Sequence, residues 1–124
     1  MSHIVTIRVE VRDFDAIKSA CRRLELKEPA YGRATVFQTE VEGVLVNLPE
    51  WIYPVVCILE TGELKYDNYN EQWGDTKYLD QFVQAYSIEK ATLEARRKGY
   101  SVVEQPLADG SVKLTLNVGN GGVA

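Results

Sequence analysis

The first segment of the chain alternates apolar and polar residues. From Val5 to Val11, valine or isoleucine occupies every second position, and threonine, arginine and glutamate lie between them. Because successive side chains of a strand point to opposite faces, this pattern predicts a half-buried strand. Asp13 then occupies an N-cap position before a short helix. One face of that helix is apolar, with Ile17, Ala20, Cys21 and Leu24.

A loop and two further strands follow this helix. Residues 25–32 contain a proline and a glycine, which predicts a loop. Residues 34–41 and 44–48 are predicted strands, and Glu42-Gly43 separates them. Glycine allows a tight turn between paired strands, so we expect a hairpin that reverses at these two residues.

Residues 55–59 are apolar throughout and include valine and isoleucine. A run without polar positions leaves no face for solvent, which favours a central strand covered on both faces. Thr61-Gly62 predicts a turn after it. Leu64 and Tyr66 stand two positions apart in the next strand, so they share one face.

A long helix is predicted between Asp75 and Gly99. Asp75 suits the N-cap, and Gly99 suits the position after the C-cap because glycine adopts the left-handed conformation without strain. Apolar residues follow the helical spacing i, i+3, i+4, i+7 at Leu79, Phe82, Val83 and Tyr86. The second half of the helix is richer in charge, so we expect the first half to lie on a sheet.

The C-terminal part predicts a second hairpin. Residues 100–105 are extended, and Asp109-Gly110 is a strong turn signal. Apolar residues then alternate with polar ones at Val112, Leu114, Leu116 and Val118. Residues 119–124 are expected to form a flexible tail.

These elements predict an α+β fold. Their order is β-α-β-β-β-β-α-β-β, which indicates a mostly antiparallel sheet with both helices on one face. A chain of 124 residues suits one domain with a sizeable core, and we assign that domain to residues 1–118. Residues 119–124 remain outside it as the tail.

Composition narrows the classes of function. The net charge is −4 and the isoelectric point is about 5.0, which disfavours nucleic-acid binding by bulk electrostatics. No apolar run approaches the roughly 20 residues that span a bilayer, and we expect no membrane association and no signal peptide. The two cysteines, Cys21 and Cys57, lie among apolar neighbours, which predicts buried, reduced thiols in a cytoplasmic protein.

The richest candidate for a binding site is the run before the long helix. It combines amphipathic aromatic side chains with amides and carboxylates, as interfaces and ligand clefts do. The candidate binding residues are Tyr66, Asp67, Asn68, Tyr69, Trp73, Asp75 and His3. The free N–H groups at the start of the helix could also hold an anion. The competing interpretation is structural: the aromatic residues cover a sheet edge, the amides form turns, and Asp75 is a helix cap.

Catalytic and metal chemistry have little support. The sequence contains no Gly-x-Ser-x-Gly motif, no P-loop and no dinucleotide-binding glycine motif. One histidine, His3, and two separated cysteines disfavour a metal site, and we expect no cofactor. Trp51 and Tyr53 form a second aromatic loop around Pro54. If the two aromatic loops meet, they form one aromatic patch.

Several motifs resemble one known family. They are the opening Met1-Ser2-His3 strand, the helix after Asp13, the Tyr-Asp-Asn-Tyr run before Trp73-Gly74, the segment 82–86, and the ending Glu104-Gln105-Pro-Leu-Ala-Asp-Gly-Ser-Val-Lys-Leu. On these motifs the chain resembles the conserved hypothetical chloroplast reading-frame family, number thirty-five of that series, with its cyanobacterial and other bacterial relatives. The resemblance covers nearly the whole chain. The family has no established activity, so it implies an intracellular protein of unknown function and assigns no site residue.

Three hypotheses of function follow. The first is a non-enzymatic binding or adaptor module that acts in a protein complex, with a protein partner and a tendency to form homo-oligomers through open sheet edges. The second is a small-molecule-binding protein or enzyme with a cleft near the loop 66–75. The third is nucleic-acid binding through Arg22, Arg23 and Lys27 or through residues 96–98, which the acidic composition disfavours most.

Overall fold

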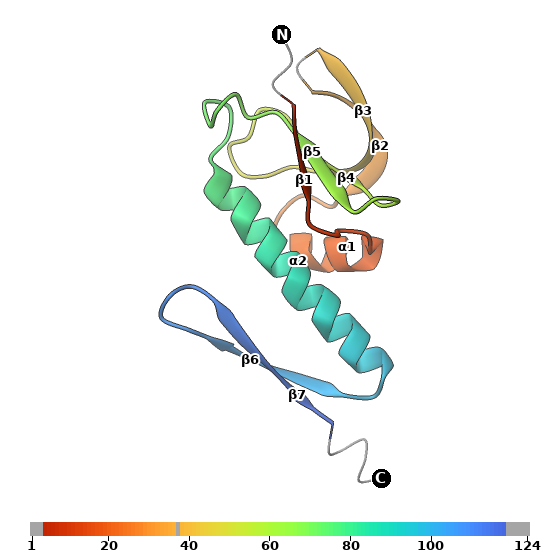
Figure 1. Cartoon of the computed structure of the whole chain (residues 1–124), viewed down its shortest axis with the longest axis vertical. Helices are drawn as coiled ribbons and strands as arrows, with labels where there is room; N and C mark the ends of the chain where they lie inside the picture. Colours follow the sequence, from red (N-terminus) through yellow and green to blue (C-terminus); the bar gives the residue numbers. More distant parts are fainter. Residues whose placement is uncertain (1–3, 37, 119–124) are drawn as a thin grey trace. The chain divides into compact units, whose positions relative to one another are not determined.

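The computed structural model of the chain describes residues 4–36 and 38–118. In these residues the elements follow the predicted order (Figure 1). They are β1 (Val5–Arg8), α1 (Phe14–Arg23), β2 (Ala30–Val36), β3 (Thr39–Val46), β4 (Val55–Ile58), β5 (Glu63–Tyr66), α2 (Thr76–Arg97), β6 (Ser101–Pro106) and β7 (Val112–Asn117). The α+β class and the antiparallel pairing predicted from the sequence are therefore confirmed.

The strands form two separate sheets. Five strands pair antiparallel in the order β1-β5-β4-β3-β2, and β6 pairs with β7 in a two-stranded sheet. The described residues divide into two compact units, and the boundary lies inside α2 between Tyr86 and Ser87. The single domain that we assigned to residues 1–118 is thus described as two units. The expected tail, residues 119–124, lies outside the described residues.

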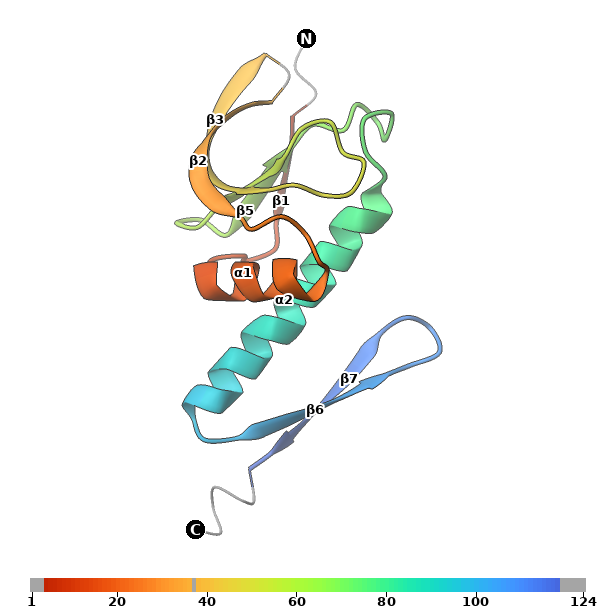
Figure 2. The same cartoon turned by 180° about the vertical axis from the view of Figure 1, so that it is seen from behind.

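The core of the first unit lies on one face of the five-stranded sheet. Cys57 of β4 is the register partner of Leu64 in β5, so the two side chains share a face. Burial raises the pKa of the Cys57 thiol, and Cys21 of α1 raises it further, which places α1 against this face. Burial also raises the pKa of Tyr66, with a further rise from Asp80 of α2. Helix α1 and the part of α2 that belongs to the first unit therefore lie beside the sheet on that face (Figure 2).

A tyrosine joins the two helices of the first unit. The side chain of Asp13 accepts a hydrogen bond from the Ala16 N–H at 3.2 Å, which confirms the predicted N-cap of α1. The hydroxyl oxygen of Tyr86 accepts from the backbone N–H groups of Arg12 and Asp13, each at 3.0 Å. These groups lie at the start of α1, where backbone donors lack partners within the helix. Tyr86 thus fixes the last α2 turn of this unit to the entry of α1.

The predicted hairpin at Glu42-Gly43 is wrong. Strands β2 and β3 do form a hairpin, but Val36 pairs with Thr39, so the chain reverses there instead. Gly43 lies inside β3, where a Cβ atom would be 2.6 Å from the carbonyl oxygen of Cys57 and 2.8 Å from a methyl group of Val56. Glycine is needed at this position because β4 lies too close for a side chain, and not because the chain turns there.

The local signals of the second unit are confirmed. Gly99 has a φ of +83° and donates its N–H to the Arg96 carbonyl at 2.9 Å. The Tyr100 N–H donates to the Ala95 carbonyl at 2.9 Å, which completes a Schellman motif at the end of α2. In the β6–β7 turn, Asp109 accepts from the backbone N–H and the hydroxyl of Ser111 at 2.9 and 2.6 Å.

Replacement of Tyr86 by phenylalanine tests the junction between the helices. The variant keeps the ring but removes the acceptor of two backbone N–H groups, so the free energy of unfolding is expected to fall by about 1–3 kcal/mol. Urea unfolding followed by circular dichroism measures this change. Tyr31→Phe is the matched control because Tyr31 is 58% exposed, and it should change the free energy by less than about 0.5 kcal/mol. Equal effects of the two substitutions would contradict this role of Tyr86.

Candidate functional site

The candidate binding residues differ in their exposure to solvent. Tyr66 ends β5 and is buried, as are Asp67 and Asn68 after it. Tyr69 and Trp73 are half-buried and Asp75 is exposed. His3 lies outside the described residues. The loop therefore holds half of its described candidate residues inside the molecule, where they are not available on its surface.

The backbone of this loop adopts an uncommon conformation. Tyr69, Asn70 and Glu71 have φ values of 46°, 50° and 71°, so three consecutive residues other than glycine lie in the left-handed region. Such residues are disfavoured sterically and persist only when surrounding contacts hold them. Asp67 provides one such contact, because its Oδ1 accepts from the Tyr69 N–H at 3.0 Å.

Buried amide groups close the loop. The Trp73 N–H donates to the Asn68 carbonyl at 2.9 Å, and the Asn68 side-chain Nδ2 donates to the Gly74 carbonyl at 3.1 Å. Asn68 thus bonds the far end of the loop through both its main chain and its side chain. Its amide is engaged within the loop, as the structural interpretation of this run expects.

The two aromatic loops meet, which is the condition under which the sequence predicts one aromatic patch. Trp51 packs edge-on against Tyr66, with ring centroids 5.5 Å apart. Tyr53 packs edge-on against Trp73 at 5.6 Å, and Tyr69 contacts the same indole ring at 4.7 Å. Edge-to-face pairs at these separations are favourable beyond the area that they bury. The aromatic patch therefore has a stabilising role of its own.

Hydrogen bonds and a glycine fix this packing. The Trp51 indole donates to the Asp75 carbonyl at 3.0 Å, and the Ile52 N–H donates to the Trp73 carbonyl at 3.0 Å. A Cβ atom on Gly74 would overlap the indole ring of Trp51. No side chain fits at residue 74 while the ring stays in place. Gly74 is therefore required by the contact between the loops.

The start of α2 is capped by carboxylates of the chain itself. Asp75 accepts from the Lys77 N–H at 2.9 Å, which confirms its predicted role as N-cap. Glu71 accepts from the Thr76 N–H at 3.2 Å and from the Thr76 hydroxyl at 2.7 Å. Two negative side chains thus occupy the region where a bound anion would lie. This arrangement argues against the anion site considered for this helix end.

One buried oxygen in the loop lacks a hydrogen-bond donor. Asp67 is 1% exposed, and its Oδ2 has no hydrogen-bond partner in the described part of the chain, although its Oδ1 is bonded. A carboxylate oxygen in such a place has an unused capacity to accept a hydrogen bond. It is the feature of this loop that a ligand with a hydroxyl or amine group could use.

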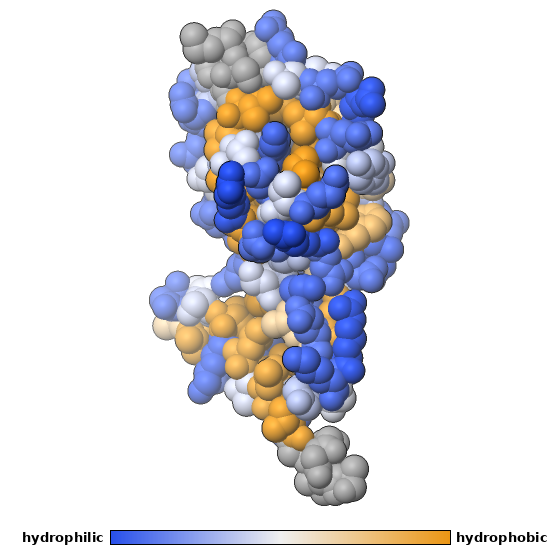
Figure 3. All heavy atoms as spheres, turned by 45° about the vertical axis from the view of Figure 1, so that its right-hand side comes forward, coloured by the Kyte–Doolittle hydropathy of each residue, from blue (hydrophilic) through white to orange (hydrophobic). Residues whose placement is uncertain are grey.

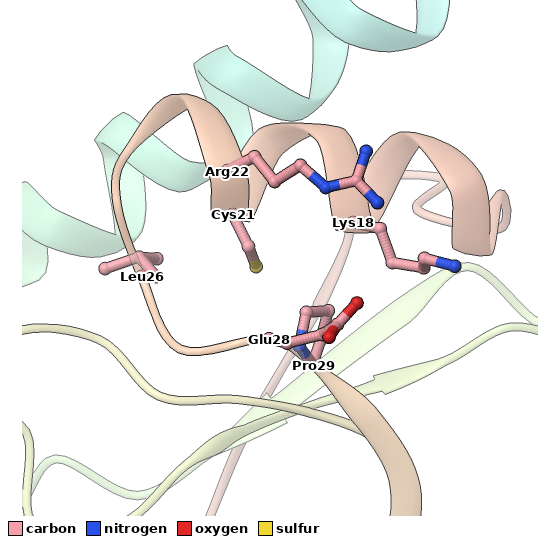
Figure 4. A pocket seen from close by; sticks show the side chains of 6 residues that line it. All are labelled: Lys18, Cys21, Arg22, Leu26, Glu28 and Pro29. Atoms are coloured by element: carbon pink, nitrogen blue, oxygen red, sulfur yellow. The ribbon is translucent and has the colours of Figure 1, made fainter.

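A small hollow lies beside α1, away from this loop. Its volume is about 140 Å³, and its lining residues are Lys18, Cys21, Arg22, Leu26, Glu28 and Pro29 (Figure 4). Ligand pockets usually enclose roughly 300–1,000 Å³, so this hollow is small. Sequence reasoning missed it because a helix face and a later loop form it together. Burial raises the pKa of the Cys21 thiol to about 11, which disfavours the nucleophilic thiolate at neutral pH.

The described residues show neither a metal cluster nor a helix suited to a bilayer. Within residues 4–36 and 38–118, no group of three or more His, Cys, Asp or Glu side chains could hold a metal ion. No helix in these ranges is long and apolar enough to cross a membrane. In comparisons with known proteins, no family model matches the chain, and neither a curated protein nor a solved structure matches it.

Substitutions of Asp67 test the role of this carboxylate in the loop. Asp67→Ala removes the acceptor that holds the left-handed turn, so the free energy of unfolding should fall by about 1–3 kcal/mol. Asp67→Asn keeps an oxygen acceptor for the Tyr69 N–H and removes a buried charge, so its loss should be less than half as large. Urea unfolding of both variants measures the difference. If asparagine were as damaging as alanine, the charge and not the turn would be what the fold requires.

The raised pKa of Cys21 predicts slow alkylation. A thiol with a pKa of about 11 in place of 9.0 has about a hundredfold less thiolate at pH 8, and the thiolate is the nucleophile. Cys21 in the folded protein should therefore react with iodoacetamide at least that much more slowly than in 8 M urea. Mass spectrometry of digested protein follows Cys21 and Cys57 separately. Equal rates in the folded and unfolded chain would contradict the buried, neutral thiol.

Proposed function

We propose that this chain is a non-enzymatic binding module that acts in a protein complex, and that the β6–β7 hairpin carries its binding surface. The observation behind the proposal is a group of large apolar side chains that solvent reaches in this hairpin. Val103, Leu107, Leu116 and Val118 are exposed to 57%, 41%, 50% and 47%. Figure 3 shows hydrophobic surface over this part of the chain. Grouped exposed apolar residues are typical of interaction sites.

The register of the hairpin gathers most of its apolar side chains on one face. Val102 pairs with Leu116 and Pro106 pairs with Val112, so these four residues lie on the same face. The opposite face carries Ser101, Gln105, Lys113, Thr115 and Asn117, with Val103 as its one apolar residue, and Glu104 lies opposite Leu114 on the first face. An amphipathic sheet of this kind gains free energy when its apolar face is covered.

The second half of α2 covers this apolar face only in part. A hollow of about 250 Å³ remains beside the helix, lined by Ala91, Glu94, Ala95, Lys98, Tyr100 and Leu116. The alanines leave room next to Leu116 that longer side chains would fill. Two strands alone are marginally stable in water, and further strands or packed elements stabilise them. A protein partner would supply that additional contact.

The aromatic loop supports a second candidate function, a small-molecule-binding protein or enzyme with its cleft near residues 66–75. The observation in its favour is the unused buried oxygen of Asp67. Its other candidate groups are engaged inside the loop: Asn68 bonds Gly74, and Asp75 caps α2. The hairpin, in contrast, offers exposed apolar side chains, among them Leu116 and Val118. This contrast favours the binding module.

The proposal includes two further points. Membership in the chloroplast reading-frame family named above rests on the motifs that resemble it, and that family assigns no activity. A cytoplasmic location is supported by Cys21 and Cys57, which are both free and buried. Free thiols are usual in reducing compartments.

Native mass spectrometry of protein purified gently from its own cells tests the proposal. The wild-type chain should carry a bound protein, and Leu116→Lys should reduce the bound fraction at least about tenfold because it puts a charge on the apolar face. Lys113→Gln, on the polar face of the same strand, should leave the bound fraction unchanged. A small-molecule adduct without bound protein would support the second candidate. A bare wild-type chain, or equal binding by both variants, would contradict the binding module.

A further inference from the structure

We infer that the partner of this hairpin is a second copy of the chain, joined through the outer edge of β7. This inference rests on the proposed function, because it names the occupant of the same surface. Within the described residues, β7 pairs with β6 alone, so its other edge has no neighbouring strand. Such an edge presents a row of backbone donors and acceptors that another strand can bind.

The geometry of the turn identifies the backbone groups at this edge. The Leu107 N–H donates to the Ser111 carbonyl at 2.9 Å. In an antiparallel ladder, hydrogen-bonded pairs alternate with pairs that are not hydrogen-bonded. The register therefore makes Gln105–Lys113, Val103–Thr115 and Ser101–Asn117 the hydrogen-bonded pairs of the hairpin. Lys113, Thr115 and Asn117 therefore direct their backbone groups toward β6. The alternate residues Val112, Leu114 and Leu116 direct theirs outward.

The other sheet edges are less suited to symmetric pairing. Arg33 lies at the centre of β2, and pairing β2 with a second β2 about this residue would place two arginines opposite each other. Pro106 directs no N–H to the free edge of β6. Strand β1 has only 4 residues, whereas β7 has 6 with neither a proline nor a central charge.

Strand β7 is complementary to itself when two copies pair antiparallel about Thr115. In that register Leu114 lies opposite Leu116 of the second copy, and Val112 lies opposite Val118. Lys113, the one charged residue of β7, lies opposite Asn117 of the second copy and so avoids a like charge. Apolar pairs thus share one face, and polar pairs share the other. Thr115 of one copy lies opposite Thr115 of the other, and threonine pairs across strands are favourable.

The same register satisfies the hydrogen bonds of the edge. The pairs Leu114–Leu116 and Val112–Val118 would each exchange both backbone bonds, because these are the residues whose groups point outward. The result is a four-stranded sheet in the order β6-β7-β7-β6. Three or more strands with an apolar face are stable where two are marginal. Leu116, about half exposed in one chain, lies next to the two-fold axis on the new apolar face.

Opposite charges at Thr115 give a specific test. Thr115 is exposed on the polar face, so a charged side chain is tolerated in the single chain. The full-length wild type should sediment as a dimer at about 100 µM. Thr115→Arg or Thr115→Glu alone should weaken dimerisation roughly tenfold, since like charges then face each other at the two-fold axis. An equimolar mixture of the two variants should restore the dimer. Ser101→Arg adds the same charge to the same face of β6 and should leave dimerisation unchanged.

Each result has a defined meaning. A wild type that sediments only as monomer, or dimers of Thr115→Arg as stable as wild type, would overturn self-pairing. Failure of the mixture to restore the dimer would place the interface elsewhere. If the chain is monomeric but native mass spectrometry finds a different protein that Leu116→Lys releases, self-pairing fails and the binding module stands. A monomer that carries no protein contradicts both.

Discussion

The contact between Gly74 and the indole ring of Trp51 is the constraint on which the first unit depends. It allows the loop before β4 and the loop before α2 to lie against each other, and the Trp51 indole then bonds the carbonyl of Asp75 at the start of α2. Tyr86 fixes the same helix about three turns later, where its hydroxyl accepts two N–H groups at the entry of α1. Between these two points Phe82 is fully buried. The helix is thus positioned by contacts at both ends of this segment as well as by its apolar side chains.

The composition of the aromatic loop suggested a binding site, but its contacts in the structure mainly stabilise the fold. Its tyrosines, tryptophans, amides and carboxylates are the residue types that binding sites use. In the structure Asn68 closes the loop, Glu71 and Asp75 cap a helix, and the rings pack on one another. The left-handed run from Tyr69 to Glu71 is held by these contacts. Only the free oxygen of Asp67 goes beyond this structural account.

The hairpin of the second unit has the opposite character. Its turn and its junction with α2 are closed by local hydrogen bonds, but its apolar side chains are incompletely covered. The outward backbone groups of β7 and the side chains of Leu114, Leu116 and Val118 follow one alternating pattern. An additional strand at this edge would therefore satisfy the outward backbone groups and place apolar side chains beside those of β7 on the same face. Because the free backbone groups and the exposed apolar side chains lie on the same strand, the hairpin is the proposed binding surface.

The sequence by itself determined the features that depend on neighbouring residues. The caps at Asp13 and Asp75, the helix end at Gly99 and the turn at Asp109-Gly110 all involve groups within a few positions, so residue type and spacing suffice to predict them. An unbroken apolar run likewise identified the central β4, and the spacing of Leu64 and Tyr66 identified their shared buried face. The class of the fold and the order of its elements followed from these local signals.

The tertiary structure alone decided which segments meet. Gly43 resembled a turn residue, yet β4 approaches it too closely for any side chain, and that approach depends on residues more than ten positions away. The same reason applies to Gly74 with Trp51, which lies 23 positions earlier in the chain. A glycine, an aromatic ring or an apolar face in a sequence shows what can pack. The partner that it packs against is determined only when the whole chain has folded.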